Sequence, residues 1–268
     1  ELCPQLGIAI PVGKDSMSMR AKWNDSGVEQ QVTAPLSLIV TGFSPVKNAR
    51  KTLTPELRSD HGETELWLLD LGAGKNRMGA SALAYVYDEI GQHAPNVDDA
   101  QTLKAFFAAV QELNQADLLL AYHDRSDGGL WATLCEMAFA GRTGIDVEVS
   151  RLDADPVRAL FSEELGAVIQ VKANAVDRLT AILATHGLDA IAHRIGHLTA
   201  DRHIRIRDSN ALLLEHDLLT LYGYWTETTH HIQRRRDNPQ CADDERATNL
   251  DPTNSGLHAR LTFDGSAL

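Results

Sequence analysis

The stretch His123-Asp124-Arg125-Ser126-Asp127-Gly128-Gly129 is the most informative in the chain. An apolar run at 118–122 precedes it, and an apolar helical pattern at 130–140 follows it. We therefore predict a strand, a tight polar turn and a helix. Free backbone N–H groups at a helix N-terminus favour anionic oxygens, and carboxylates at the same point can hold a hard divalent cation. The turn is thus a candidate site for nucleotide phosphate and magnesium.

A structural role explains the same residues without a ligand. Asp, Ser and Gly are ordinary residues at helix starts, so Ser126 either supplies a hydroxyl to a ligand or caps the helix. His123, next to the turn, is either a ligand contact or a buried turn histidine. The density of polar groups within seven residues favours the ligand role, but spacing alone leaves both interpretations open.

Composition narrows the class of protein. The chain has 268 residues, of which 43% are hydrophobic and 6% aromatic, as in a globular α/β protein. A formal net charge of −12 argues against nucleic-acid or anionic-membrane partners. No apolar run approaches the ~18 residues of a membrane span. We expect no nucleic acid and no membrane among the partners.

The cysteines and the first residue bear on the cellular compartment and on the extent of the chain. Cys3, Cys135 and Cys241 form no metal-binding or paired spacing, and such a sparse set suits a reducing compartment, so we expect a cytoplasmic protein. Cys135 falls in an apolar helical pattern and is expected in the core. The chain begins with Glu1, and we expect it to be a piece of a longer protein.

A second polar cluster, Gly13-Lys14-Asp15-Ser16, follows an apolar run at 8–12. Glycine permits close backbone approach, Lys14 could neutralise a phosphate, and Asp15 could bind metal or orient Lys14. The spacing is not that of a Walker loop, and the next segment alternates like a strand. A solvated turn between strands is the favoured alternative.

The remaining pattern mixes strands and helices, which predicts an α/β (α+β) fold. Predicted strands cover 8–12, 17–23, 36–43, 65–71, 145–149, 167–171, 192–196, 203–207 and 211–215. Predicted helices cover 82–90, 97–116, 156–161, 174–186 and 217–236. The strands at 17–23 and 36–43 are expected to form a hairpin with a long loop.

Four other segments carry less specific signals. The polar segment 48–64 is expected to link two lobes. The glycine-rich loop 72–81 could hold an anion at the following helix start or simply pack closely. Glu163 and Glu164 could line a cation site, although a solvated surface is the favoured interpretation. Beyond Asn238 no periodicity is visible, and we expect a linker.

Three separated motifs, in this order, resemble the large-type phosphoribosylformylglycinamidine synthases of the aminoimidazole-ribonucleotide-synthetase-like superfamily. The motifs are 10–19 (IPVGKDSMSM), 123–129 (HDRSDGG) and 161–166 (FSEELG). Trp225, Glu227-Thr228 and the segment 236–243 (RDNPQCAD) also resemble the region before the glutaminase domain of these enzymes. The resemblance runs through essentially the whole chain.

The resemblance implies an ATP-dependent ligase of purine biosynthesis. Such an enzyme converts formylglycinamide ribonucleotide, ATP and glutamine to formylglycinamidine ribonucleotide, ADP, phosphate and glutamate. Residues 1–48 would end the second β-rich synthetase lobe, 63–216 would form the second α/β lobe, and 217–268 would be a helix and linker toward a missing glutaminase domain. The cofactors would be Mg²⁺ and ATP or ADP, and the partners the rest of the synthetase region and the glutaminase domain.

Site residues follow from the same resemblance. Asp124 matches a magnesium ligand and Ser126 a nucleotide contact, with Gly128 and Gly129 beside it. The segment 13–16 matches a substrate or phosphate motif at the ligand cleft. Gly79-Ala80-Ser81 departs from the superfamily, where relatives often carry a second glycine. The other magnesium ligands, the main ATP loop and the glutaminase cysteine are outside this chain, so the piece alone is expected to be inactive. The alternative is a structural lobe that scaffolds its duplicate and docks the glutaminase without binding ligand.

Overall fold

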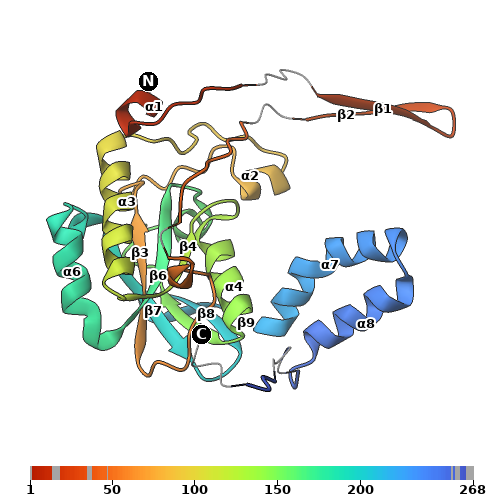
Figure 1. Ribbon diagram of the computed structural model, residues 1–268. Coiled ribbons are helices and arrows are strands. Elements are labelled where there is room, and N and C mark those ends of the chain that lie inside the picture. Colours follow the sequence, from red (N-terminus) through yellow and green to blue (C-terminus); the bar gives the residue numbers. More distant parts are fainter. Residues whose placement is uncertain are drawn as a thin grey trace. The chain divides into compact units, whose positions relative to one another are not determined.

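The computed structural model describes residues 2–13, 19–34, 38–46, 48–254, 256 and 260–263 (Figure 1). The chain divides into two compact units, Glu1–Thr52 and Leu53–Leu268. Each unit is built around its own sheet.

The first unit is a hairpin with two short helical segments. Helix α1 covers Leu2–Leu6, strands β1 and β2 cover Arg20–Asp25 and Val28–Thr33, and the 3₁₀ turn η1 covers Ala49–Lys51. β1 and β2 are antiparallel, from Arg20 opposite Thr33 to Asp25 opposite Val28. None of the residues described in this unit is buried.

The prediction that 17–23 pairs with 36–43 across a long loop is wrong. The partner strand is β2, reached through the two residues Ser26 and Gly27, whose φ angles are 52° and 88°. Asn24 Oδ1 accepts the Gly27 N–H at 2.8 Å and closes the turn. Two consecutive positive φ angles match the twist of a tight hairpin. Residues 38–43 and 8–12, also predicted as strands, are not in strands.

A seven-stranded mixed sheet forms the second unit, in the order β4-β6-β3-β7-β5-β8-β9. The strands are β3 Thr64–Asp70, β4 Leu119–Asp124, β5 Gly144–Glu148, β6 Gly166–Lys172, β7 Ala192–Thr199, β8 His203–Asp208 and β9 Ala211–Asp217. Among these pairings β5 and β8 are parallel, and the others are antiparallel. The predicted α/β class is confirmed.

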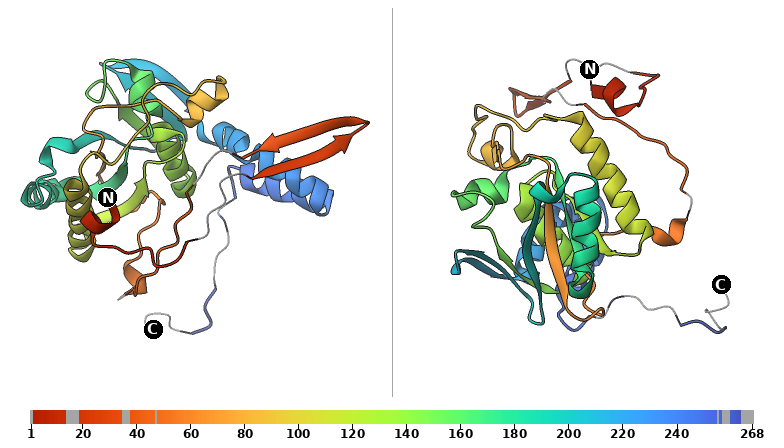
Figure 2. Two further views of the ribbon diagram at one scale, coloured as in Figure 1. Left: turned by 90° about the horizontal axis from the view of Figure 1, so that it is seen from above. Right: turned by 90° about the vertical axis from the view of Figure 1, so that its left-hand side faces the viewer.

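Helices cover both faces of this sheet. They are α2 Ala82–Val86, α3 Ala100–Gln115, α4 Gly129–Gly141, α5 Pro156–Phe161, α6 Val176–Thr185, α7 Leu218–Arg236 and α8 Pro239–Leu250, with 3₁₀ turns η2 Ala173–Ala175 and η3 Asp189–Ile191. One core packs α4, α5 and α7 against the sheet, and the other packs α3 and α6 (Figures 1 and 2). Because helices cover both sides of β3 and β6, most residues of these two strands are buried.

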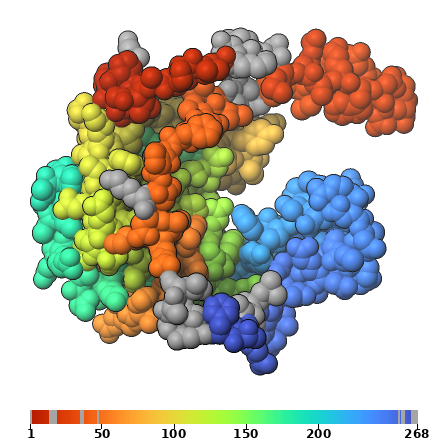
Figure 3. Space-filling model, in the orientation of Figure 1, coloured from red at the N-terminus to blue at the C-terminus, as the bar shows by residue number. Residues whose placement is uncertain are grey.

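Beyond Asn238, where the sequence shows no periodicity and a linker is expected, the structure has a helix, α8, at 239–250. Asn238 caps this helix through its side chain, and Pro239 sits in the first turn. Ala242 is buried, and Arg246 donates to the Gly223 carbonyl of α7 at 3.0 Å. In the space-filling view α7 and α8 form a projection of this unit (Figure 3). Ala242 is the one buried residue that the structure describes in α8, and so the sequence of this helix has no regular apolar face.

Within the described residues, no helix is both long enough and apolar enough to cross a bilayer.

Candidate functional site

The edge where β3 and β4 end and β6 begins gathers the polar segments of the second unit. β6 is antiparallel to both neighbours, with Asp70 opposite Gly166 and Asp124 opposite Ala167. Three segments therefore meet at the same end of these neighbouring strands: the turn 124–129, the acidic turn 162–166 and the glycine-rich loop 71–81. In the sequence these were separate candidates.

Exposure alternates along the central turn. Asp124 and Ser126 are exposed, as is Asp127, whereas Arg125 is only 3% exposed. The two residues predicted to contact metal and nucleotide are thus accessible. The residue between them is fixed inside the protein.

Arg125 anchors the turn to the other two segments. Its guanidinium forms a buried ion pair with Asp70, the last residue of β3. It also donates to the carbonyls of Glu164 and Leu165, at 2.6 and 3.0 Å, and its backbone N–H donates to Gly166 at 2.8 Å. A buried charge is tolerated only when paired and hydrogen-bonded, as here. Sequence reasoning missed Asp70, although an acid that ends a buried strand is itself a signal.

The glycines of the turn adopt left-handed conformations, with φ of 82° at Gly128 and 65° at Gly129. The Gly128 N–H donates to Glu163 Oε1 at 2.8 Å, and the Gly129 N–H donates to the Ser126 carbonyl at 2.9 Å. Both predicted amides therefore already have acceptors within the chain. The N-cap residue of α4 is Gly128 rather than Ser126, so the alternative that Ser126 caps this helix is wrong.

The acidic turn is not a solvated surface, since Glu164 is fully buried. Arg77 holds its carboxylate with both Nε and Nη2, at 2.6 and 2.7 Å, and with its backbone N–H at 3.1 Å. Such a bidentate pair satisfies the buried acid. Glu163 is half-buried, and its Oε1 accepts the N–H groups of Gly128 and Ala82, both at 2.8 Å.

The basic side chains of the glycine-rich loop, Lys75 and Arg77, are paired with acidic side chains. The hydrogen bond to Glu164 raises the pKa of Arg77 above its ordinary value, with a further contribution from Asp98. Lys75 and Arg77 in turn lower the pKa of Asp98. A cavity of about 520 Å³ is lined by this loop together with His93 and Arg158.

The structure shows the burial and contacts of His123, which lies next to the turn, and of Cys135 in α4. His123 is half-buried, and its Nε2 lies 2.8 Å from Glu136 Oε2 of α4. Cys135 is 6% exposed, and burial raises its pKa to about 12. The expectation that Cys135 belongs to the core is confirmed, because this residue is part of the buried cluster around α4.

The second polar cluster is only partly visible. Gly13 is exposed, and a Cβ there would meet nothing within 4 Å. Lys14, Asp15 and Ser16 lie outside the described residues, so their role stays a prediction. Among the residues that are described, no group of three or more His, Cys, Asp or Glu side chains could hold a metal ion.

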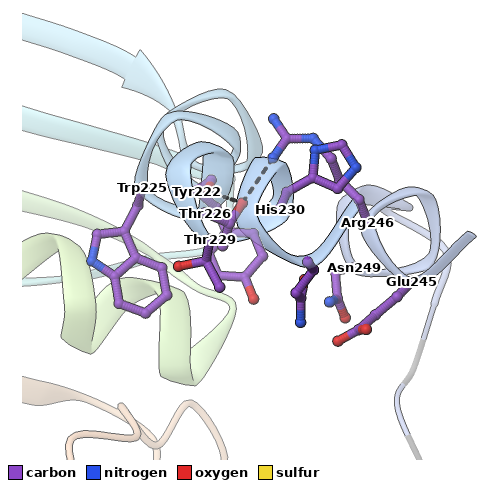
Figure 4. Close-up of a pocket in the computed structure, with 9 residues that line it drawn as sticks. Tyr222, Trp225, Thr226, Thr229, His230, Glu245, Arg246 and Asn249 are labelled. Carbon is purple, nitrogen blue, oxygen red and sulfur yellow. Dashed lines mark hydrogen bonds between the residues drawn. The ribbon is translucent and has the colours of Figure 1, made fainter. Parts of the chain in front are cut away.

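A separate cavity of about 470 Å³ lies between α7 and α8 (Figure 4). Tyr222 and Trp225 stack on one side of it, with ring centroids 5.8 Å apart. Arg246 donates to Thr226 Oγ1 at 3.3 Å across the two helices. Its lining comes from α7 and α8 and includes none of the predicted site residues described here.

Two parts of the chain match models of known protein families. Residues 66–209 match the family described as "AIR synthase related protein, C-terminal domain", and residues 1–45 match the "FGAR-AT PurM_N-like domain". The first match covers more than half of the chain, and so the chain belongs to the AIR synthase related family. The two matches confirm the predicted recognition of an AIR-synthase-like chain, whose residues 1–45 are similar to the FGAR-AT type of domain.

Solved structures from Thermotoga maritima share the fold. PurLQS is 16% identical, with a TM-score of 0.51 over 64% of this chain and 27% of that chain. PurL complexed with ATP is 17% identical, with a TM-score of 0.51 over 65% and 27%. Phosphoribosylformylglycinamidine synthase II is 18% identical, with a TM-score of 0.51 over 65% and 28%. This chain thus spans little more than a quarter of these structures.

Proposed function

We propose that the chain supplies part of a nucleotide and magnesium pocket to a phosphoribosylformylglycinamidine synthase. The parent reaction would use ATP, formylglycinamide ribonucleotide and glutamine-derived ammonia, the last from a glutaminase domain. The observation that carries the proposal is the exposure of Asp124 and Ser126 on either side of the buried Arg125. A turn held this rigidly presents its two outward residues in a fixed geometry, which ligand binding requires.

The proposed roles follow the chemistry of each group. Mg²⁺ is usually held by one or two carboxylates together with substrate phosphates and water, and Asp124 fits as one such ligand. When bound, the ion would neutralise charge on the phosphates. Ser126 would donate a hydrogen bond to the nucleotide, beside the backbone of Gly128 and Gly129.

The second polar cluster has a role of its own in the proposal. Gly13, Lys14, Asp15 and Ser16 would contact substrate or phosphate. The other magnesium ligands and the main ATP loop would come from the rest of the synthetase region, so this chain alone would be inactive. The sparse cysteines fit a parent enzyme working in the cytoplasm.

A structural role is the second candidate. One observation favours it: the amides of Gly128 and Gly129 already donate to Glu163 and Ser126. On this alternative, the lobe scaffolds its duplicate and docks the glutaminase without binding ligand.

Calorimetric titration of ADP separates the two functions. We expect the wild-type chain, within a protein that also carries the rest of the synthetase region, to bind ADP in the presence of Mg²⁺ and to lose this binding in excess EDTA. Asp124→Ala should weaken magnesium-dependent binding by about tenfold, the loss of one charge-assisted contact. Asp189→Ala, which removes another exposed aspartate, is the matched control and should bind normally. Equal affinity in the wild type and Asp124→Ala would favour the structural role.

A further inference from the structure

One carboxylate oxygen of Glu163 serves two helix starts. It accepts the N–H of Gly128, where α4 begins, and the N–H of Ala82, the first residue of α2. Both bonds are 2.8 Å long. The sequence marked these same two helix starts as candidate anion positions, and in the structure the protein's own acid bridges them.

The backbone that carries Glu163 packs directly against the turn. A Cβ at Gly129 would lie 2.7 Å from the carbonyl oxygens of Leu160 and Ser162. Only glycine fits there, since φ is also 65°. The side chain of Glu163 therefore starts from a fixed point beneath the turn.

The neighbouring acid, Glu164, binds the same loop at a different point. Glu164 binds Arg77 in the middle of the glycine-rich loop, whereas Glu163 binds Ala82 immediately after that loop. The side chain of Arg125 donates to the Glu164 carbonyl and pairs with Asp70, the last residue before the loop. No described side-chain contact joins Arg125 to the loop itself. The bridge through Glu163 is thus the direct hydrogen-bonded link between the turn and the start of α2.

We infer that Glu163 is a positioning residue for the proposed nucleotide site. By bridging the Gly128 and Ala82 amides it fixes the turn and so places Asp124 and Ser126. It acts through its acceptor oxygen rather than through its negative charge. This inference rests on the proposed function.

Substitutions at Glu163 test the inference by calorimetric binding of ADP with Mg²⁺, alongside the melting temperature of each variant. Glu163→Gln retains the accepting oxygen and should bind within about twofold of the wild type. Glu163→Ala removes both hydrogen bonds and should bind about tenfold more weakly. Glu89→Ala, at an exposed glutamate of the same unit, should change neither quantity.

Ala82→Pro tests the bridge without touching Glu163, and it serves even if Glu163→Ala does not fold. Proline is tolerated at the first helical position, and Ser81 has the extended backbone, φ −72° and ψ 158°, that a following proline requires. The variant lacks one donor of the bridge, and ADP should bind about threefold more weakly.

The outcomes that overturn the inference differ from the one that overturns the proposed function. Unchanged affinity in Glu163→Ala or Ala82→Pro, even with a lower melting temperature, would leave only a structural role. Tighter binding in Glu163→Gln would show that the carboxylate competes with the ligand. If Asp124→Ala binds like the wild type, or the wild type shows no magnesium-dependent binding, the proposed function itself fails. A normal loss in Asp124→Ala with no effect at Glu163 would overturn the inference alone.

Discussion

Breaking the buried pair of Arg125 and Asp70 should cost a large part of the stability of the second unit. Arg125→Met removes the guanidinium and leaves the Asp70 carboxylate, whose side chain is 5% exposed, without its cation. Two backbone donors remain, from Gly72 at 3.2 Å and Gly74 at 2.8 Å. Removing one partner of a buried ion pair typically costs about 3–5 kcal/mol. We expect about 4 kcal/mol for Arg125→Met.

The double variant separates pairing from packing. Asp70→Ala alone leaves the buried Arg125 charge without a partner, whereas the double variant with Arg125→Met leaves no unpaired charge at this position. The free energies of unfolding should therefore be non-additive, with the double variant about 2 kcal/mol better than the sum of the single variants. Urea unfolding followed by circular dichroism measures all four proteins. A cost below about 1 kcal/mol for Arg125→Met, or single costs that add within about 0.5 kcal/mol, would refute this reasoning.

Three further predictions concern the backbone and pH. Ala80 has φ of 58°, so Ala80→Gly should stabilise the chain by about 1 kcal/mol in thermal unfolding; a loss of stability would contradict this. Gly129→Ala should lower the melting temperature much more than Gly187→Ala, because φ is 65° and 69° respectively but a Cβ meets backbone only at Gly129; similar losses would be inconsistent with close packing. The hydrogen bond from Arg205 holds the pKa of Asp201 well below its ordinary value of 3.8. Asp201→Asn should therefore be less stable than the wild type above that value, and the difference should disappear as the pH falls through the lowered pKa. A difference that persists unchanged in strong acid would exclude this cause.

The sequence contained enough information for most elements of the second unit. Strands β3 and β6 are apolar runs with clear ends, and α3 has a regular apolar face with an Asp99 cap. The order of the strands in the sheet was not predictable in this way. Only the antiparallel pairing of β6 with β3 and β4 brings Asp70 beside Arg125. Non-local pairing depends on the packing of the whole unit, which local patterns do not contain.

The failures have identifiable physical causes. Glu164 was expected in solvent because adjacent acids usually are, and its bidentate partner Arg77 is 87 residues away in the sequence. The hairpin partner of β1 was missed because 38–43 is more apolar than β2, whose sequence is VEQQVT. In both cases a tertiary partner or turn geometry outweighed the local pattern.

Paramagnetic broadening by Mn²⁺ tests most directly whether the turn presents Asp124 and Ser126 to a metal-bound nucleotide. Mn²⁺ replaces Mg²⁺ at oxygen-rich sites and broadens nearby amide signals in a ¹H–¹⁵N spectrum. With ADP present, we predict that substoichiometric Mn²⁺ broadens the amides of residues 124–129 but not that of Gly187, and that Asp124→Ala abolishes the effect. Undisturbed signals from 124–129 at an ADP concentration that saturates binding would contradict a ligand role for this turn.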